Sequence, residues 1–490
     1  MRTACTGIVW FRQDLRLSDN PALREASRTC DRIVPVYIHA PGEAGRWSPG
    51  GASRWWLHHS LARLDEGLRK LDSRLVIRTT SSSADEILSL ARAAGADCIY
   101  WNRLYDPASI QRDTRIAQIL QAGGHRVETF SASLLNEPWT ALNRQGRPYR
   151  VFTPYWKACL EAGIERAILP GPRKLARVPD AIHSVTLERL GLVPTVGWAR
   201  EMRGAWQPGE SAARRRLKHF LDVSLTDYDV RRDIPSVDGT SRLSPYLHHG
   251  EISPAQIAGA VLERLASAKD ARMSGGAEGL LRELGWREFG YHLLYHFPHT
   301  TDRPLDDRFA HFPWSKRFRE PLRAWQQGRT GIPIVDAGMR QLWRIGWMHN
   351  RVRMIVASFL TKNLLIPWQE GARWFWDTLV DADLASNTLG WQWIAGCGAD
   401  AAPYFRIFNP VTQGRRFDPE GRYVRQWVPE IAHLPDRHVH TPWQAPDDVL
   451  RKGGVTLGRS YPLPLIELRI SRERALQRYA AMKNSSRHAT

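Results

Sequence analysis

The chain has 490 residues, 43% of them hydrophobic, which exceeds what one hydrophobic core usually supports and predicts two folded domains. Its formal net charge of +19 and isoelectric point of about 10.1 favour a polyanionic partner, with nucleic acid ahead of an anionic membrane surface. Neither a membrane span, which needs an apolar run of about 20 residues, nor a signal peptide is recognisable, so we expect a cytoplasmic protein.

The first 131 residues alternate short β-rich runs with helical segments. Strands are predicted at residues 7–11, 32–40, 73–80, 97–102 and 125–131, with helices at 53–71 and 83–95 among the intervening segments. Such alternation implies right-handed crossovers and a doubly wound, mainly parallel sheet, so residues 1–131 form an α/β domain. Ligands of these sheets bind beyond the carboxyl ends of the strands.

The rest of the chain is predicted to be largely helical. Residues 132–205 carry prolines and basic residues without sustained periodicity, which indicates an interdomain linker with short helices. Helical periodicity dominates residues 206–480, which we expect to form an all-helical second domain. Residues 481–490 form a short tail that we expect to be disordered.

Cysteine and tryptophan usage adds two constraints. The five cysteines are scattered, with no paired C-x-x-C spacing, which argues against a disulfide framework or a zinc site and indicates a reducing compartment. They are Cys5, Cys30, Cys98, Cys159 and Cys397. The 21 tryptophans are far more than average usage and suit cores, stacking surfaces or electron relays.

Residues 239–244 place small hydroxyl residues and one arginine at a predicted helix start. A helix N-terminus with hydroxyl groups is a ready phosphate site. Serine and threonine are also favoured helix caps, so these residues alone leave phosphate binding and plain capping both open.

Three further segments combine polar and aromatic side chains at helical spacing. Asn350, Arg353 and Met354 share one helix face, and Glu283 and Trp286 share another. Asp381, Asp383 and Asn387 lie in an apolar helical context that includes Trp391 and Trp393. These carboxylates need partners such as Arg353 or a polar ligand, although helix capping remains the alternative for the two aspartates.

Taken in order, the motifs resemble the DNA photolyase/cryptochrome family from about Gly7 to Pro462. They are WFRQDLRLSDN, GTSRLSPYL, LGWREF, GWMHNRVRM, DADLASN, GWQW and APYFRIFNPVTQG. The resemblance implies an N-terminal α/β domain, a helical domain that holds FAD, and a pocket that receives a flipped-out lesion of ultraviolet-damaged DNA. The resemblance is closest to bacterial cyclobutane pyrimidine dimer photolyases, and we expect a monomer with no membrane partner.

The resemblance also implies the residues that bind FAD. Asp383 is expected to hydrogen-bond the isoalloxazine ring, Arg353 to pair with Asp381, and Asn387 to face flavin N5. The full set is Tyr228, Thr240, Ser241, Arg242, Leu243, Ser244, Arg287, Asn350, Arg353, Asp381, Ala382, Asp383 and Asn387. Because a neutral amide is no proton source, Asn387 favours repair over the signalling chemistry of plant cryptochromes, which carry Asp there.

For the lesion, the resemblance implies that Trp286 and Trp393 stack on the dimer and that Glu283 hydrogen-bonds it. Asn350 and Met354 fill positions where enzymes that repair (6-4) photoproducts carry histidines. The expected DNA contacts are Arg232, Glu283, Trp286, Asn350, Arg351, Met354, Trp393, Arg406 and Gln413, although plain surface charge is the alternative for Arg232, Arg351, Arg406 and Gln413. A relay from Trp391 to Trp368 and Trp314 is expected to reduce oxidised flavin.

A second, antenna chromophore is left open. Folate-binding members often carry Asn-Glu after the fourth strand, where this chain has Asp106-Pro107, so a deazaflavin, a folate held differently and no antenna are all compatible. The predicted activity is light-driven repair of cyclobutane pyrimidine dimers, a carbon–carbon lyase reaction. The alternatives are a blue-light photoreceptor without repair and a flavoprotein that binds DNA without catalysis.

Overall fold

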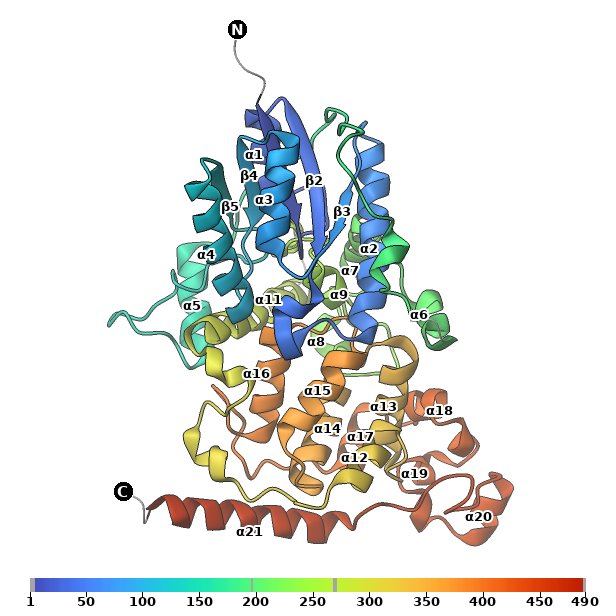
Figure 1. The fold of residues 1–490 in the computed structure, drawn as a ribbon. Helices are drawn as coiled ribbons and strands as arrows, with labels where there is room; N and C mark the ends of the chain where they lie inside the picture. The colour runs from blue at the N-terminus through green and yellow to red at the C-terminus, as the bar shows by residue number, and fades with distance from the viewer. Residues whose placement is uncertain (1–4, 195–196, 268–270, 488–490) are drawn as a thin grey trace. The chain divides into compact units, whose positions relative to one another are not determined.

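The protein is described by a computed structural model that covers residues 5–194, 197–267 and 271–487. A five-stranded, fully parallel sheet has the order β3-β2-β1-β4-β5 (Figure 1). The strands are β1 (Thr6–Phe11), β2 (Arg32–His39), β3 (Val76–Thr79), β4 (Cys98–Asn102) and β5 (Arg126–Phe130). All five predicted strands and the doubly wound topology are therefore confirmed.

The two faces of the sheet are covered by different helices. In β1, Val9 and Phe11 belong to one core cluster with residues of α1 (Pro21–Thr29) and α2 (Gly51–Arg69). Ile8 and Trp10 belong to the other, with residues of α3 (Ser83–Ala94) and α4 (Pro107–Ala122). Because side chains alternate along a strand, β1 is buried on both sides, as its nearly continuous apolar sequence indicates.

Local signals explain where these helices begin and end. Asn20 caps α1 by accepting a hydrogen bond from Leu23, and Ser82 caps α3 by accepting one from Asp85. Asp106 does the same for α4, which begins at Pro107. Asp106-Pro107, which stands where folate-binding relatives often carry Asn-Glu, thus forms the start of α4.

The chain forms two compact units that interleave along the sequence. Unit 1 comprises Met1–Thr226, Ser241–Pro298 and Val380–Ala385, and unit 2 comprises Asp227–Thr240, His299–Leu379 and Ser386–Thr490. The domain ranges predicted from the sequence, 1–131, 132–205, 206–480 and 481–490, are contiguous and stay predictions.

Unit 1 adds several helices to those around the sheet. They are α5 (Phe152–Ala162), α6 (Arg200–Ala205), α7 (Glu210–Val223), α9 (Ser244–His248), α10 (Pro254–Ala266) and α11 (Ala271–His296). Within the range predicted as a linker, α5 is the longest described helix, and it packs on α11. α11 bears several of the predicted site residues.

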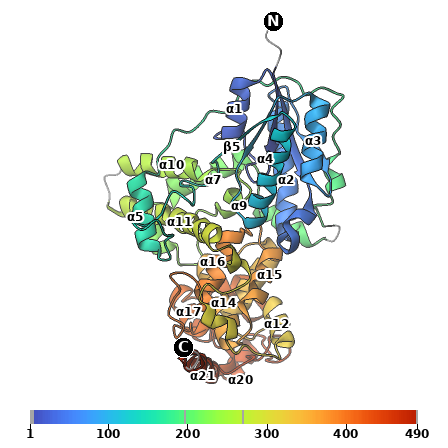
Figure 2. The same ribbon diagram turned by 60° about the vertical axis from the view of Figure 1, so that its left-hand side comes forward.

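In the described residues of unit 2, all the named secondary-structure elements are helices, as the periodicity predicts. Its helices are α8 (Tyr228–Arg231), α12 (Arg319–Gln326), α13 (Pro333–Ile345), α14 (Asn350–Ser358), α15 (Trp368–Thr378), most of α16 (Leu384–Ala395), α17 (Pro410–Phe417), α18 (Arg422–Trp427), α19 (Asp436–Val439), α20 (Asp447–Lys452) and α21 (Leu468–Arg487). Figures 1 and 2 show α14, α15 and α16 packed together.

The chain end differs from the prediction. We expected residues 481–490 to be disordered, but α21 continues to Arg487, and residues 488–490 lie outside the described part. Among the residues that the structure describes, no helix is long and apolar enough to cross a membrane.

Candidate active site

The motif WFRQDLRLSDN anchors the turn after α9. The Arg16 guanidinium donates to the carbonyl oxygens of Gly250 (2.9 Å) and Ala132 (2.9 Å), and the backbone N–H of Leu15 donates to His249 O (3.2 Å). Gly250 has φ +68, and a Cβ there would lie 2.0 Å from Gln13 O, so this position requires glycine. The loop after β1 therefore holds residues 248–250 in place.

Those residues in turn lie beside Asp381 and Asp383. The ring nitrogen Nε2 of His249 is 3.3 Å from Val380 O, and the Ser244 hydroxyl donates to Asp381 Oδ2 (2.5 Å). Asp383 accepts a hydrogen bond from the Tyr291 hydroxyl. Unit 1 thus brings together Ser244, Asp381 and Asp383, three residues that the family resemblance assigns to FAD.

Asp383 is buried yet stays charged. Burial raises the pKa of its carboxyl, but His248 and Arg287 outweigh that effect and hold the pKa well below its usual value. His248 Nδ1 lies 3.9 Å from Asp383 Oδ2 and is itself buried, with no hydrogen-bond partner among the described residues. A buried anion beside an unsatisfied ring nitrogen is suited to bind a polar ligand.

The loop before α9 is bent at Arg242, which has φ +51, an uncommon conformation for a residue with a side chain. Arg216 Nε donates to Ser241 O (2.8 Å) and fixes this bend. In the described part of the chain, Leu243 occupies the capping position of α9 and its side chain makes no capping hydrogen bond. The Ser241 hydroxyl accepts a bond from the Leu243 N–H (3.4 Å). Ser244 bonds Asp381 instead, which weakens the plain capping alternative for residues 241–244.

Glu283, Trp286 and Arg287 all lie on α11, and all three are partly exposed. One face of Trp286 stacks on Phe152 of α5, with ring centroids 3.8 Å apart and an interplanar angle of 8°. Arg287 donates to Ser133 O (2.7 Å) and lies 3.3 Å from Glu288. Glu283 and Trp286 therefore share a helix face, as their spacing predicts.

Close packing of α5 on α11 fixes Trp286. A Cβ on Gly285 would lie 2.6 Å from the Trp156 ring, so glycine is needed for the approach of α5. Phe152 covers one face of Trp286, and the predicted stacking on a lesion falls to the opposite face.

In unit 2, α14 begins at Asn350, which confirms the predicted helix. Arg353 Nε donates to Met348 O (2.8 Å). Arg351 pairs with Asp233 (2.7 Å) and lies 3.8 Å from the sulfur of Met354. Arg351, expected to contact DNA phosphate, is thus an ion-pair partner in this structure.

The other predicted DNA and nucleotide residues of unit 2 lie on helices or turns. The Arg232 guanidinium lies 5.1 Å from the ring centroid of Tyr228. Arg406 is exposed, and Gln413 is partly buried on α17. Thr240, at the end of the 227–240 segment, is partly buried, as is Trp393 on α16.

Helix α16 carries Asn387 and Trp391, both buried. The Asn387 amide donates to Ala372 O of α15 (3.0 Å), which fixes the orientation of this side chain. Trp391 contacts the rings of Phe375 (5.0 Å between centroids) and Trp325 (6.2 Å), and a Cβ on Gly371 would lie 2.0 Å from it. The residue is therefore held tightly between α12 and α15.

The other two predicted relay tryptophans have different environments. Trp368 is buried at the start of α15, with 2% of its surface exposed. Trp314 is partly exposed and contacts Phe312, with 4.4 Å between ring centroids. A buried and a partly exposed tryptophan fit the middle and outer positions predicted for them.

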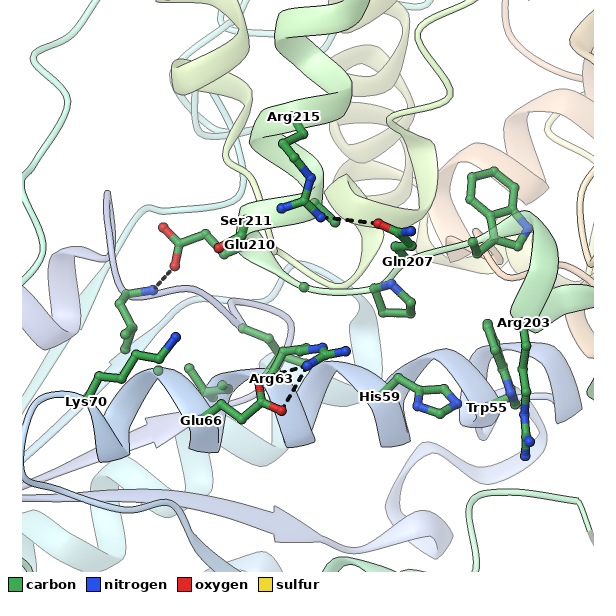
Figure 3. Close-up of a pocket in the computed structure, with 18 of the residues that line it drawn as sticks. Trp55, His59, Arg63, Glu66, Lys70, Arg203, Gln207, Glu210, Ser211 and Arg215 are labelled. Atoms are coloured by element: carbon green, nitrogen blue, oxygen red, sulfur yellow. Dashed lines mark hydrogen bonds and ion pairs between the residues drawn. The ribbon is translucent and has the colours of Figure 1, made fainter.

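Unit 1 also contains a cavity of about 810 Å³ between α2 and the start of α7 (Figure 3). Its charged lining residues are Arg63, Glu66, Lys70, Arg203, Glu210 and Arg215. Its aromatic lining residues are Trp55, His59 and Trp206. The basic side chains outnumber the acidic ones, so the cavity favours an anionic ligand with a planar aromatic part.

His59 is neutral in this cavity. Burial, with the positive charges of nearby residues, lowers its pKa to about 4, and its buried Nε2 has no hydrogen-bond partner in the described part of the chain. Its ring lies 4.8 Å from that of Trp55.

Comparison with known proteins decides the family. Residues 7–173 match the family described as DNA photolyase, and residues 280–481 match the FAD binding domain of DNA photolyase. The chain is 47% identical to deoxyribodipyrimidine photo-lyase of Agrobacterium fabrum, over 98% of each protein. The chain belongs to the DNA photolyase family.

Both photolyases and cryptochromes are among its relatives. A crystal structure of a class III photolyase from Agrobacterium tumefaciens superposes with a TM-score of 0.95 at 46% identity, over 99% of each chain. Cryptochrome-2 of Arabidopsis thaliana is 42% identical over 95% of this chain and 77% of that protein. The comparisons therefore favour the photolyase function, because the two Agrobacterium photolyases match this chain at 46–47% identity over almost their whole length, whereas the cryptochrome matches at 42% over 77% of its length.

Several residues of this site were missed from the sequence. Tyr291 and His248 contact or adjoin Asp383, and Phe152 stacks on Trp286. The HHG sequence at 248–250 offered a weak signal, because paired polar residues before a glycine suggest a constrained turn. Phe152 offered none, since nothing in the sequence joins α5 to α11.

Proposed function

We propose that this protein repairs cyclobutane pyrimidine dimers in ultraviolet-damaged DNA by the deoxyribodipyrimidine photo-lyase reaction. The observation that carries the proposal is the face of α11 on which Glu283 and Trp286 lie one turn apart and partly exposed. A carboxyl group beside an aromatic ring is suited to receive a flipped-out base pair by hydrogen bonding and stacking.

The residues present fit FAD. In unit 1, the buried Nδ1 of His248 has no hydrogen-bond partner in the described part of the chain and lies beside the charged Asp383, which suits a polar ligand. Asp381 is oriented by Ser244. In unit 2, Asn387 is oriented by Ala372, and Arg353 and Tyr228 complete the proposed set with the residues named from the sequence. When bound, reduced FAD supplies the light-driven electron that opens the cyclobutane ring.

The chain's own residues are proposed to position the lesion and to stabilise the charge that it gains. Glu283 is proposed to hydrogen-bond the pyrimidine edge. Only a protonated carboxyl can donate to the oxygen that gains negative charge with the electron, so this role requires the acid form of Glu283 in the complex. Two carbon–carbon bonds of the dimer then break and the electron returns, so no net oxidation occurs. Asn387, a neutral amide held by Ala372, presents no acidic proton to flavin N5 and so preserves the reduced anion that repair needs.

Three arginines and one amide are proposed to hold the DNA backbone. Arg232, Arg351, Arg406 and Gln413 are the proposed phosphate contacts, and Arg351 would exchange its ion pair with Asp233 for phosphate. Because each neutralised phosphate releases counterions, binding weakens as salt rises.

Light-dependent repair tests the function. The protein is photoreduced with an electron donor and mixed with oligothymidine that contains cyclobutane dimers, and thymine ultraviolet absorbance is followed in blue light and in darkness. Recovery only in the light supports the proposal. No recovery, with a bound flavin that still bleaches and reoxidises, would support a photoreceptor instead.

We also propose the electron relay from Trp391 through Trp368 to Trp314. Burial of the first two and partial exposure of the third support this order. Photoreduction of oxidised flavin should slow strongly in Trp391→Phe. Unchanged photoreduction in that variant would refute the relay.

The cavity beside α2 supports a second chromophore. Its basic rim and its Trp55, His59 and Trp206 rings suit a conjugated, negatively charged molecule such as a folate or a deazaflavin. Reconstitution with each, followed by the action spectrum of repair, tests this. An added action band that Lys70→Ala and Arg203→Ala weaken supports the site, and a spectrum equal to that of reduced flavin alone contradicts it.

We further propose that the protein works as a monomer in the cytoplasm. Repair of one lesion requires one flavin and one lesion pocket, and no step above calls for a second copy. Light scattering of the purified protein at working concentration tests the monomer, which a mass near 55.9 kDa would support.

A further inference from the structure

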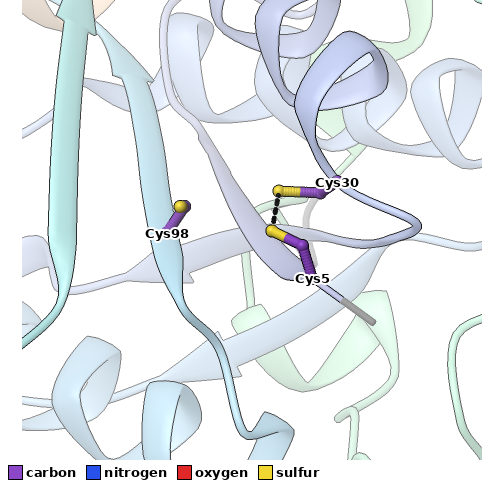
Figure 4. Close-up of side chains that lie close together, drawn as sticks. All are labelled: Cys5, Cys30 and Cys98. Atoms are coloured by element: carbon purple, nitrogen blue, oxygen red, sulfur yellow. Dashed lines mark hydrogen bonds between the residues drawn. The ribbon is translucent and has the colours of Figure 1, made fainter. Parts of the chain in front are cut away.

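Three of the scattered cysteines come together at the amino edge of the sheet (Figure 4). Cys5 precedes β1, Cys30 follows the last residue of α1, and Cys98 is the first residue of β4. Their sulfur atoms all lie within 4.8 Å of one another, and the sulfurs of Cys5 and Cys30 are 2.9 Å apart. The parallel topology causes this, because β1 pairs directly with β4 and Gly7 pairs with Cys98.

The backbone around the cluster is fixed by two carboxylates. Asp31 accepts a hydrogen bond from the N–H of Cys5 (2.8 Å), and Asp97 accepts one from the N–H of Thr6 (2.8 Å). Both carboxylates therefore serve the backbone, and the donor atoms that converge are sulfur. A Cβ on Gly7 would lie 2.9 Å from the sulfur of Cys30, so glycine at this position leaves the space that the thiol occupies.

The cluster is reachable from solvent. Cys98 is buried, but Cys5 and Cys30 are partly exposed. The hydroxyl oxygen of Tyr100 lies 3.6 Å from the Cys30 sulfur, so the surroundings are partly polar. Structural cysteines are usually inert in apolar cores, whereas two of these three are partly exposed.

Sulfur donors at this spacing match a metal centre. Ligand sulfurs at about 2.3 Å from one ion lie roughly 4 Å apart in trigonal or tetrahedral geometry, which the cluster reaches with small side-chain rotations. Thiolate ligands select soft ions such as Cu(I) and zinc over hard ones.

We propose that Cys5, Cys30 and Cys98 bind one soft d¹⁰ metal ion, Cu(I) or zinc, through three thiolates. The three thiols release their protons to solvent on binding, and with zinc a water molecule completes the tetrahedron. The site ties the N-terminal end of β1 to α1 and β4, far along the chain from the residues assigned to repair.

Cadmium titration of the full-length, FAD-containing protein, reduced and freed of metal by a chelator, tests the site. We expect a sulfur-to-cadmium charge-transfer absorption that saturates at one ion per chain, with three thiols protected from a thiol reagent. Competition by zinc and by Cu(I) then identifies the preferred ion. Cys30→Ser and Cys5→Ser should weaken cadmium binding by more than about tenfold, because loss of a residue that only orients a metal ligand already lowers metal affinity about tenfold or more.

Cys159→Ala is the matched control, because Cys159 is a buried free cysteine of the same unit outside the cluster; it should bind cadmium as the wild type does. FAD content verifies folding of each variant, and because Cys5 is partly exposed, we expect at least the Cys5→Ser variant to fold. No saturable absorption in the reduced wild type, or an absorption unchanged in folded Cys5→Ser, would overturn the proposal. So would a Cys5–Cys30 disulfide that resists reduction and excludes metal.

Discussion

Asp383 and Glu251 are both buried carboxyl groups of unit 1, yet they are held in opposite states. Glu251 accepts hydrogen bonds from Trp56 Nε1 (3.1 Å), the Gly209 N–H (2.6 Å) and the Ser60 hydroxyl. Burial raises its pKa to about 8 despite these donors. Asp383 instead has Arg287 and His248 nearby, and its pKa is lowered.

Three neutral donors thus leave the pKa of Glu251 raised by burial, whereas the hydrogen bond from His248 and the charge of Arg287 outweigh burial at Asp383. At neutral pH Glu251 is largely protonated, and its hydrogen bonds connect Trp56 and Ser60 of α2 with the backbone of Gly209. Asp383 is ionised and has acceptor capacity to offer a ligand. Both carboxyl groups are buried, but their neighbours give them different charge states. Glu251 therefore serves the structure, whereas Asp383 is suited to bind a cofactor.

Removal of the charge on Asp383 should have the largest effect. Asp383→Asn is expected to lower FAD content more than about tenfold, because hydrogen bonds to charged groups contribute about 1.5–3 kcal/mol. Flavin absorbance relative to protein absorbance measures it. Glu251→Gln is the control and should keep its flavin; equal loss in both variants would mean that folding, not the Asp383 charge, controls binding.

Glu283→Gln should lower the repair yield by about tenfold while FAD content stays constant, since a charge-stabilising hydrogen bond is weakened. The yield is measured as dimers repaired per absorbed photon. Glu278→Gln, an exposed residue of the same helix, is the matched control. An unchanged yield in Glu283→Gln would remove Glu283 from the mechanism.

Glu251 should give the fold a pH dependence that Glu251→Gln lacks. Because its folded pKa of about 8 lies above the unfolded value, its contribution to stability is complete at low pH and is lost as pH rises through about 8. Between the unfolded pKa of about 4.5 and the folded value of about 8, we expect the free energy of unfolding to fall by a few kcal/mol, at about 1.4 kcal/mol per pKa unit. Thermal unfolding at pH about 5 and about 8 measures it; parallel curves for both proteins would contradict a neutral Glu251.

Phe152→Leu should have the smallest effect. Loss of the stacked ring frees Trp286 and raises the KM for dimer-containing DNA about threefold, since aromatic pairs contribute about 0.5–1.5 kcal/mol. Val151→Ala, an exposed neighbour, should leave KM unchanged. A fall in kcat with unchanged KM would mean that Phe152 acts on the reaction and not on Trp286.

The sheet was predictable because strand and helix periodicities are local properties of sequence. All five strands fell within three residues of their predicted starts, and the helix carrying Asn350, Arg353 and Met354 was expected. Contacts that depend on the folded chain were not predictable. The Cys5–Cys30–Cys98 cluster depends on the pairing of β1 with β4, whereas C-x-x-C spacing describes only cysteines that are close along the chain.

The same limit applies to the acidic residues. The sequence singled out Asp383 through its motif, but the charge state of Asp383 depends on His248 and Arg287, which lie about a hundred or more residues away. Glu251 escaped attention because its partners Trp56 and Ser60 lie on α2. The family resemblance identified the site residues. Their charge states depend on neighbours that only the packing of the folded chain brings close.

Two lesions compared in one preparation test whether the protein repairs cyclobutane dimers specifically. Reduced protein is mixed with oligonucleotides that carry either a cyclobutane dimer or a (6-4) photoproduct and is exposed to blue light. With Asn350 and Met354 in place of an acid–base histidine pair, we predict that only the cyclobutane dimer is restored. Repair of the (6-4) photoproduct, or of neither lesion, would refute the proposed repair of cyclobutane dimers alone.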